Sequence, residues 1–211
     1  MRLVGLTGGI ATGKSTFAAA LREAGAPVID ADALAREAVR KGSSALAEIA
    51  RAFGPEVIAA DGELDRRRMA AQAFSDPAAR ARLEAITHPA VRRAMAEETR
   101  RLAAEGHDLA FYDVPLLYEV GLDRQVDCVV VVWAPRELQL ARLAARDGMP
   151  AAEAEARLAA QLPVDEKAAR ADVVVRNDGD LASLRRKAAP LLAALRAGLG
   201  RRLPNAPPAR Y

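Results

Sequence analysis

Residues 3–21 read LVGLTGGIATGKSTFAAAL, and this stretch decides the class of fold. Its short apolar run predicts a buried strand, and its apolar-periodic end predicts a helix. The pattern Gly8-x-x-x-x-Gly13-Lys14-Ser15 lies between them, which is the context that a phosphate-binding loop requires. In such a loop, glycines let successive backbone N–H groups converge on phosphate oxygens, and the helix N-terminus adds partial positive charge. A chance match in a glycine-rich turn is the weaker interpretation, because both flanking elements are present.

Lys14 and Ser15 are the two residues of this loop whose side chains have a chemical role. The Lys14 ammonium would lie near the β- and γ-phosphate oxygens of a nucleotide, and the Ser15 hydroxyl would be a ligand of Mg²⁺. The loop therefore predicts ATP-dependent phosphoryl transfer, with Mg²⁺ accompanying ATP as co-substrate.

Short apolar runs bounded by turn or polar residues predict five buried strands. They are Leu3–Leu6, Ala26–Ile29, Leu109–Tyr112, Val129–Trp133 and Val173–Val175. Helical periodicity lies between them, and the last helix is expected to carry Leu184, Ala188, Leu191 and Leu195 on one face. Strands that alternate with helices predict an α/β fold of the P-loop NTPase type, a three-layer sandwich with a five-stranded parallel sheet.

Two helical stretches interrupt this alternation. Residues 34–106 contain no convincing strand and predict a helical substrate-binding insertion, with breaks expected at Gly42, Gly54-Pro55, Asp76-Pro77 and His88-Pro89. Residues 135–169 predict a smaller helical lid with Gly148-Met149-Pro150 as its central break. The nucleotide-binding core is then expected to consist of residues 1–33, 107–134 and 170–200. The tail, residues 201–211, has three prolines and no periodicity, so we expect it to be disordered.

Composition excludes several classes of protein. An apolar fraction of 51% with 28% charged residues is that of a globular protein, and no apolar run reaches the ~20 residues needed to cross a bilayer. The chain starts without a recognisable leader, which favours the cytoplasm. One cysteine and two histidines cannot assemble a zinc cluster. An aromatic fraction of 4% is too low for base-stacking platforms, so nucleic acid is not expected as a partner.

The positive charge is carried almost entirely by arginine, with lysine only at positions 14, 41, 167 and 187. A compositional bias is the simpler interpretation. The alternative is that some arginines bind polyphosphate, because the guanidinium group grips phosphate oxygens with two parallel hydrogen bonds.

Acidic residues follow two of the predicted strands. Asp30 and Asp32 end the second strand, at the edge where ligands lie in open α/β sheets, and Asp113 ends the third strand at a position that suits a ligand of Mg²⁺. Each acid has an alternative role as a helix cap or turn residue. For Asp30 the two roles are evenly balanced, whereas for Asp32 and Asp113 catalysis and metal binding are favoured.

The lid and the insertion offer further candidates. Arg142 and Arg146 are spaced i,i+4, so they share a helix face, and arginines on a mobile flap could stabilise charge on the transferring phosphate. Without further support, a solvated helix face is the simpler interpretation. For His88, which precedes Pro89, the simpler interpretation is a helix-boundary residue.

Taken in order, these segments resemble the dephospho-CoA kinase family. The resemblance is carried by Thr7-Gly8-Gly9-Ile10-x-x-Gly13-Lys14-Ser15, Ile29-Asp30-Ala31-Asp32, Thr87-His88-Pro89, Asp113-Val114-Pro115-Leu116-Leu117-Tyr118-Glu119, Gln139-x-x-Arg142-x-x-x-Arg146, Arg157-x-x-x-Gln161 and Ala171-Asp172-x-x-x-x-Asn177. Each segment except the phosphate-binding loop is weak alone, but their ordered combination over residues 1–190 is specific. One departure is Ala11-Thr12, where the family usually has Gly-Ser; alanine is tolerated there if its φ is negative.

The resemblance implies ATP-dependent phosphorylation of the ribose 3′-hydroxyl of dephospho-CoA, the last step of coenzyme A synthesis. It implies a helical CoA-binding domain for residues 34–106 and a lid for residues 135–169, with no oligomer, nucleic acid or membrane required. It also makes Asp32 the candidate base.

Site residues are carried over position by position. The catalytic candidates are Asp32, Lys14 and Arg142. The candidates for binding ATP are Gly8, Gly9, Ala11, Thr12, Gly13, Lys14, Ser15, Thr16, Arg142 and Asn177. The candidates for binding the acceptor are Thr7, Asp32, His88, Pro115, Leu116 and Glu119. The candidates for holding Mg²⁺ are Ser15 and Asp113.

Three other readings compete with this one. A nucleoside or nucleoside-monophosphate kinase would share the loop and the lid and differ only in its acceptor pocket. A nucleotide-switched protein such as a small GTPase would need an Asn-Lys-x-Asp segment, and the sequence has none. A non-catalytic nucleotide-binding subunit would keep Lys14 without needing a base at Asp32.

Overall fold

The computed structural model describes residues 1–200 and 209–210, with the backbone alone described for Phe74, Ala209 and Arg210. The chain divides into two compact units. The first combines the N-terminal segment Met1–Ile29 with the C-terminal part that begins at Leu102, and the second is Asp30–Arg101.

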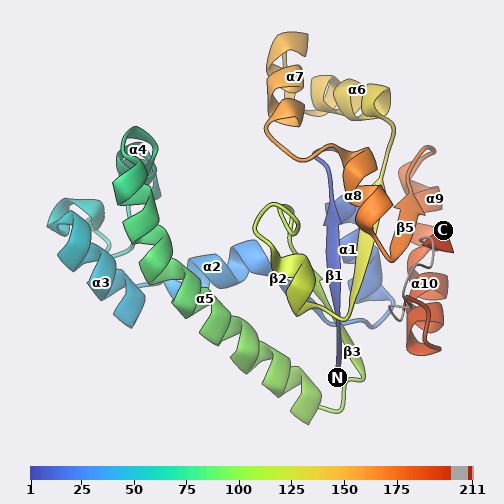
Figure 1. Ribbon diagram of the computed structural model, residues 1–211, viewed down its shortest axis with the longest axis horizontal. Helices are drawn as coiled ribbons and strands as arrows, with labels where there is room; N and C mark the ends of the chain where they lie inside the picture. Colours follow the sequence, from blue (N-terminus) through green and yellow to red (C-terminus); the bar gives the residue numbers. More distant parts are fainter. Residues whose placement is uncertain (201–208, 211) are drawn as a thin grey trace. The chain divides into compact units, whose positions relative to one another are not determined.

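A sheet with strand order β2-β3-β1-β4-β5-β6 forms the centre of the first unit. Its strands are β1 (Arg2–Gly8), β2 (Val28–Asp30), β3 (Leu109–Asp113), β4 (Cys128–Trp133), β5 (Val173–Arg176) and β6 (Ala209–Arg210). The central strand β1 pairs in parallel with β3 and β4, and β4 pairs in parallel with β5 (Figure 1). All five expected strands are present, so the predicted α/β class and its five parallel strands are confirmed.

The tail differs from its prediction. Residues 201–208 and 211, which we expected to be disordered, lie outside the described residues. Ala209 and Arg210 form strand β6, which pairs in parallel with β5, so the prediction was wrong for these two residues. The edge of β5 offers unpaired backbone groups, and pairing satisfies them without any need for sequence periodicity.

Helices α1 and α10 pack on the sheet by burying apolar side chains against it. The first unit contains α1 (Lys14–Glu23), η2 (Leu122–Gln125), α6 (Arg136–Asp147), α7 (Ala151–Ala159), α8 (Val164–Arg170), α9 (Leu181–Arg186) and α10 (Ala188–Arg196). Its main core joins Val4, Leu6, Val130 and Val132 of the strands to Phe17 and Leu21 of α1 and Leu191 and Leu195 of α10. A second cluster holds α6 and α7 together through Leu143, Met149 and Ala154, and Figure 1 shows these two helices side by side.

The final helix is two helices, not one. Leu184, Ala188, Leu191 and Leu195 are all buried as expected, but the chain changes from α9 to α10 at Lys187. Pro190 lacks the N–H that a continuous helix would donate to the Arg186 carbonyl, and proline is tolerated best in the first turn of a helix, where Pro190 lies in α10. The expected break at Gly148 is present, with Gly148 in the left-handed conformation at φ 60°.

The second unit is helical. It contains α2 (Ala31–Ala38), α3 (Ser44–Phe53), η1 (Pro55–Val57), α4 (Arg66–Ser75) and most of α5 (Pro77–Ala104). Its core includes Val39, Ile49, Val57, Met69 and Ala90. Asp30, Ser43 and Asp65 cap α2, α3 and α4 by accepting hydrogen bonds from backbone N–H groups.

The expected break at His88-Pro89 is wrong, because Pro89 lies inside α5. A proline inside a helix removes one backbone hydrogen bond and costs roughly 3 kcal/mol. Burial compensates for that cost, since Leu83, Ile86 and Ala90 on either side of Pro89 pack into the core of this unit. Among the described residues, no helix combines the length and the apolar content that a bilayer crossing needs.

Candidate active site

The phosphate-binding loop joins β1 to α1, and its glycines are required by close neighbours. A Cβ on Gly8 would lie 2.7 Å from both the Val132 carbonyl oxygen and Thr12 Oγ1. Gly13 has φ 92°, and a Cβ there would lie 2.5 Å from Asn177 Nδ2. The buried Thr12 closes the loop by donating its hydroxyl to the Gly9 carbonyl at 2.8 Å. The loop is therefore held in shape by its own residues and by β4 and the segment after β5.

Ala11 stands in the left-handed region, with φ 59°. Alanine was expected to be tolerated here if its φ was negative, and the φ of Ala11 is positive. An L-residue with a Cβ pays roughly 1–2 kcal/mol in this conformation. The loop thus stores a small strain at a position that glycine would occupy without cost.

Lys14 forms an ion pair with Asp113, which joins the first residue of α1 to the last residue of β3. The two side chains are only 14% and 9% exposed. The register between β1 and β3 sets Leu6 beside Asp113, so the sheet itself delivers the acid to the start of the phosphate-binding loop. Both residues were predicted from the sequence, and the structure brings them together.

Ser15 and Asp113 offer a hydroxyl and a carboxylate oxygen, which are the hard ligands that Mg²⁺ takes in proteins. Over the described part of the chain, no group of three or more His, Cys, Asp or Glu residues could hold a metal ion by itself. The donor set therefore fits a Mg²⁺ ion that arrives with a nucleotide and keeps phosphate oxygens and water as further ligands.

Arg142 of α6 donates hydrogen bonds both to the phosphate-binding loop and to the segment after β5. Its guanidinium donates to the carbonyl of Ala11 at 3.3 Å and to the carbonyls of Asn177 and Gly179 at 3.3 and 3.2 Å. Burial lowers the pKa of Arg142. The simpler interpretation of a solvated arginine is therefore wrong, although a contact with phosphate stays a prediction.

Asn177 contacts the phosphate-binding loop, whereas Arg146 bonds a neighbouring residue of its own helix. The buried Asn177 donates from Nδ2 to the Thr12 carbonyl at 2.7 Å, which ties the segment after β5 to the phosphate-binding loop. Arg146 instead bonds the exposed Asp147, whose hydrogen bond raises the pKa of Arg146. Of Arg142 and Arg146, Arg142 alone has described contacts with the loop.

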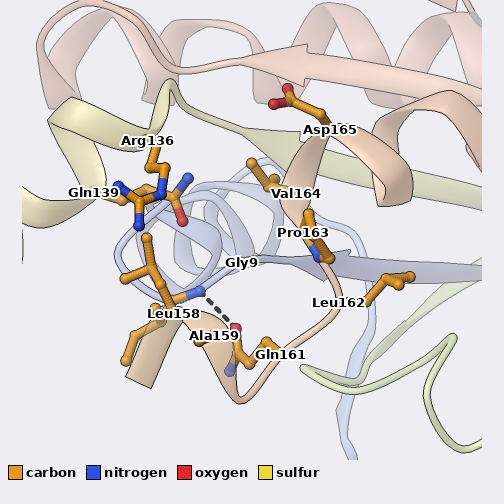
Figure 2. Close-up of a pocket in the computed structure, with 11 residues that line it drawn as sticks. Gly9, Arg136, Gln139, Leu158, Ala159, Gln161, Leu162, Pro163, Val164 and Asp165 are labelled. Carbon is orange, nitrogen blue, oxygen red and sulfur yellow. Dashed lines mark hydrogen bonds between the residues drawn. The ribbon is translucent and has the colours of Figure 1, made fainter. Parts of the chain in front are cut away.

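Two glutamines of the lid line a pocket beside the loop. The Ile10 N–H donates to Gln161 Oε1 at 2.9 Å, and the buried Gln139 donates to the Ala134 carbonyl. Figure 2 shows the hydrogen bond between Ile10 and Gln161 as a dashed line, with Leu158 and Pro163 on the pocket wall. The pocket has a volume of about 220 Å³ and includes Gly9 and Ile10 in its lining. The sequence showed both glutamines as motif positions but gave them no role.

The turn after β3 carries three of the predicted acceptor residues. Thr7 is buried and donates its hydroxyl to the Pro115 carbonyl at 3.0 Å. Leu116 is 40% exposed, whereas the Glu119 carboxylate lies 2.7 Å from Lys167 Nζ. Lys167 is the residue that sequence reasoning missed, since no motif includes it.

In the helical unit, Asp30 and Asp32 have different roles. The Asp30 carboxylate accepts the Ala33 N–H at 2.9 Å and caps α2, so its role as a cap is confirmed. Asp32 lies in the first turn of α2 with its side chain exposed, and it is not the cap. His88 lies exposed within α5.

Comparison with known proteins identifies the same family that the sequence motifs resemble. The family described as Dephospho-CoA kinase matches residues 2–183. A dephospho-CoA kinase of Anaeromyxobacter dehalogenans is 71% identical over 211 residues, which is 100% of both chains. One from Symbiobacterium thermophilum is 51% identical over 95% of this chain and 82% of its own.

Solved structures have a similar fold over nearly the whole chain. The dephospho-CoA kinase of Campylobacter jejuni superposes with a TM-score of 0.73 at 28% identity, covering 94% of this chain and 99% of its own. A protein from Thermus thermophilus superposes with a TM-score of 0.77 at 42% identity, covering 92% of this chain and 97% of its own.

Proposed function

The chain belongs to the dephospho-CoA kinase family, and from that premise we propose how its own residues perform the reaction. It transfers a phosphoryl group from ATP to the ribose 3′-hydroxyl of dephospho-CoA, the last step of coenzyme A biosynthesis. The observation that carries this function is the family match over residues 2–183, which contains a complete phosphate-binding loop. The chemistry of each side chain below is our proposal.

The phosphates of ATP lie on the N–H groups of residues 8–16, and Lys14 binds the β- and γ-oxygens. Support comes from the Lys14–Asp113 ion pair, since a carboxylate holds the ammonium at the start of α1 until phosphate oxygens replace it. That exchange leaves the Asp113 carboxylate, with the Ser15 hydroxyl, for the Mg²⁺ ion that accompanies ATP. The ion supplies neutralising charge at the β- and γ-phosphates.

Arg142 stabilises negative charge on the transferring group. Its present hydrogen bonds to the carbonyls of Ala11, Asn177 and Gly179 are to neutral acceptors. A hydrogen bond from guanidinium to phosphate is roughly twice as strong as one between neutral groups. The γ-phosphate can therefore take Arg142 from the Ala11 carbonyl, while the three bonds to Asn177 and Gly179 keep the guanidinium in place.

Asp32 is the general base. The 3′-hydroxyl must lose its proton as its oxygen attacks the γ-phosphorus, and a carboxylate within hydrogen-bond reach accepts that proton. Because Asp30 already caps α2, the exposed Asp32 carboxylate is left for chemistry. ADP then leaves with the bond between its β-phosphate and the bridging oxygen intact.

The remaining acceptor residues divide into two sets. Leu116 and His88 are exposed and are assigned direct contact with dephospho-CoA, on sequence correspondence. Thr7, Pro115 and Glu119 bond within the protein and are assigned to shaping the turn after β3. Residues 34–106 are accordingly the acceptor domain and residues 135–169 the lid. We assign the reaction to a single chain, and to the cytoplasm.

A panel of acceptors tests this function. The full chain is incubated with ATP and Mg²⁺ and with dephospho-CoA, adenosine or AMP, and the phosphorylated products are quantified. Dephospho-CoA should react far faster, because contacts to the pantetheine arm help to position the hydroxyl. Equal rates with adenosine would contradict the acceptor assignment and leave a general small-acceptor kinase.

A further inference from the structure

Lys167 of α8 is a buried cation that the proposed reaction does not use. Its side chain is 0% exposed, and its Nζ lies 2.7 Å from Glu119 Oε1. Nζ also donates to the Pro115 carbonyl oxygen at 3.1 Å. An ammonium group is expensive to bury unless a counter-charge and acceptors meet its donors. Its role must therefore be sought in what these two partners do.

Both partners belong to the turn that begins at Asp113, the acid paired with Lys14. The Pro115 carbonyl accepts two hydrogen bonds, one from Lys167 and one from the Thr7 hydroxyl at 3.0 Å. A carbonyl oxygen has two lone pairs, so these two donors satisfy it fully. The backbone two residues after Asp113 is thus fixed from both sides.

The second partner extends the contact to the phosphate-binding loop. Glu119 Oε1 also accepts the Leu162 N–H at 3.1 Å. The neighbouring residue, Gln161, accepts the Ile10 N–H of the loop at 2.9 Å. Lys167 therefore holds the carboxylate that holds the linker between α7 and α8, and that linker contacts the loop.

The choice of lysine supports a specific task. Lysine occurs at only four positions in a chain with 31 lysine and arginine residues, and position 167 is one of them. A compact ammonium can aim separate donors at a carbonyl and at a carboxylate, whereas the planar guanidinium of arginine presents a fixed fork. A buried space between Pro115 and Glu119 suits the ammonium.

We propose that Lys167 is a positioning residue for phosphoryl transfer. It holds two segments in place against the phosphate-binding loop: the turn from Asp113 to Glu119, and the linker that contains Gln161 and Leu162. Because it is fully buried, it acts through these segments and not by touching a substrate. This inference rests on the proposed function, and the wild-type rate in the same assay tests that function separately.

The experiment compares Lys167→Met, Glu119→Gln and the double variant with a control on the same helix, Glu166→Gln. Glu166 is exposed on α8 and has no described contact with the turn from Asp113 to Glu119. The readouts are kcat, the KM for ATP and for dephospho-CoA, and the melting temperature.

Misplaced catalytic segments should lower kcat of Lys167→Met by about 10- to 100-fold. The KM for ATP should change by less than about 3-fold, since the binding groups remain. The double variant should be no slower than Lys167→Met, because the two residues act as one unit. Glu166→Gln should stay within about 2-fold of wild type, as expected for an exposed side chain.

Three results would overturn the inference while the wild type remains active. They are a kcat of Lys167→Met within about 2-fold of wild type, losses that add in the double variant, or an equal loss in Glu166→Gln. If Lys167→Met does not fold, the proposal is tested by Glu119→Gln alone. It must lower kcat at an unchanged melting temperature, and a wild-type kcat would reject the role of the pair.

Discussion

Pairs of charged side chains that are distant in the sequence occur in the first unit, whereas the described pairs within the helical unit join neighbours on one helix. In the nucleotide-binding unit, Lys14 pairs with Asp113 and Lys167 with Glu119, across long separations in the chain. In the helical unit, pairs such as Arg80–Glu84 and Arg101–Glu98 join residues three or four positions apart on exposed helix faces.

This difference separates charges that are positioned by the whole fold from charges that are positioned by one helix. A pair between distant segments exists only when the sheet has formed, so its geometry is fixed by the fold and can be used for chemistry. A local pair needs only a helix and contributes roughly 0.2–0.5 kcal/mol. On the proposed function, mutations of the buried pairs Lys14–Asp113 and Lys167–Glu119 should therefore change rates, whereas mutations of local pairs should change stability slightly.

Lys14→Met should show the largest effect. Loss of the ammonium removes charge that offsets the transferring phosphate, so kcat should fall by about 10³-fold while the melting temperature changes little. Lys41→Met is the control, since Lys41 lies in the helical unit and donates to the Asp61 carbonyl. A loss of stability in Lys14→Met that matches its loss of activity would make Lys14 structural.

Arg142→Ala should come next. It should lower kcat by about 10²-fold and raise the KM for ATP less, because its charge matters most in the transition state. Arg146→Ala one turn along removes an arginine that bonds the exposed Asp147, and should remain close to wild type. Steady-state kinetics of both variants measure the contrast, and an unchanged kcat in Arg142→Ala would leave Arg142 with a structural role alone.

Ala11→Gly tests the strain in the loop. Glycine adopts φ 59° without penalty, so the variant should gain about 1 kcal/mol in free energy of unfolding. Ala19→Gly, inside α1, is the matched control and should lose about 1 kcal/mol. Urea unfolding of both variants and the wild type measures whether the free energy of unfolding rises or falls. A loss of stability in Ala11→Gly would show that the left-handed conformation is not strained.

Glu98→Gln should show the smallest effect. A hydrogen bond from Arg101 lowers the pKa of Glu98 below its ordinary 4.5. Because the folded pKa is the lower one, the stabilisation is present above the unfolded pKa and is lost as pH falls through the folded value. At pH 7 the variant should lose about 0.5 kcal/mol or less, and the difference should vanish in acid. A stability difference between wild type and variant that grows in acid would contradict a lowered pKa for Glu98.

The sequence contained enough to predict the parallel sheet, because apolar runs alternating with helical periodicity depend on local pattern alone. It also placed Lys14 and Asp113, since strand ends and the glycine loop mark their positions. Pro89 was misjudged because a local rule predicts a break, whereas the packing of Leu83, Ile86 and Ala90 keeps α5 continuous. Strand β6 could not be foreseen, because it depends on the free edge of β5.

The contacts of Arg142 and Lys167 depend on segments more than thirty positions away and were beyond local reasoning. One signal was available for Lys167. Lysine is rare in this arginine-rich chain, and all four lysines contact a backbone carbonyl or a carboxylate through Nζ. A rare residue type in a biased composition can thus indicate positions where geometry, and not charge alone, is required.

The role of Asp32 as the base is the central claim, and one pair of variants tests it most directly. Asp32→Asn keeps the shape of the side chain but cannot take the proton, so kcat with dephospho-CoA should fall by about 10²–10⁴-fold. Asp30→Asn is the control, because asparagine caps a helix about as well as aspartate, and its kcat should stay near wild type. A near-wild-type kcat in Asp32→Asn would contradict the account and move the search for the base to Asp30 and Asp113.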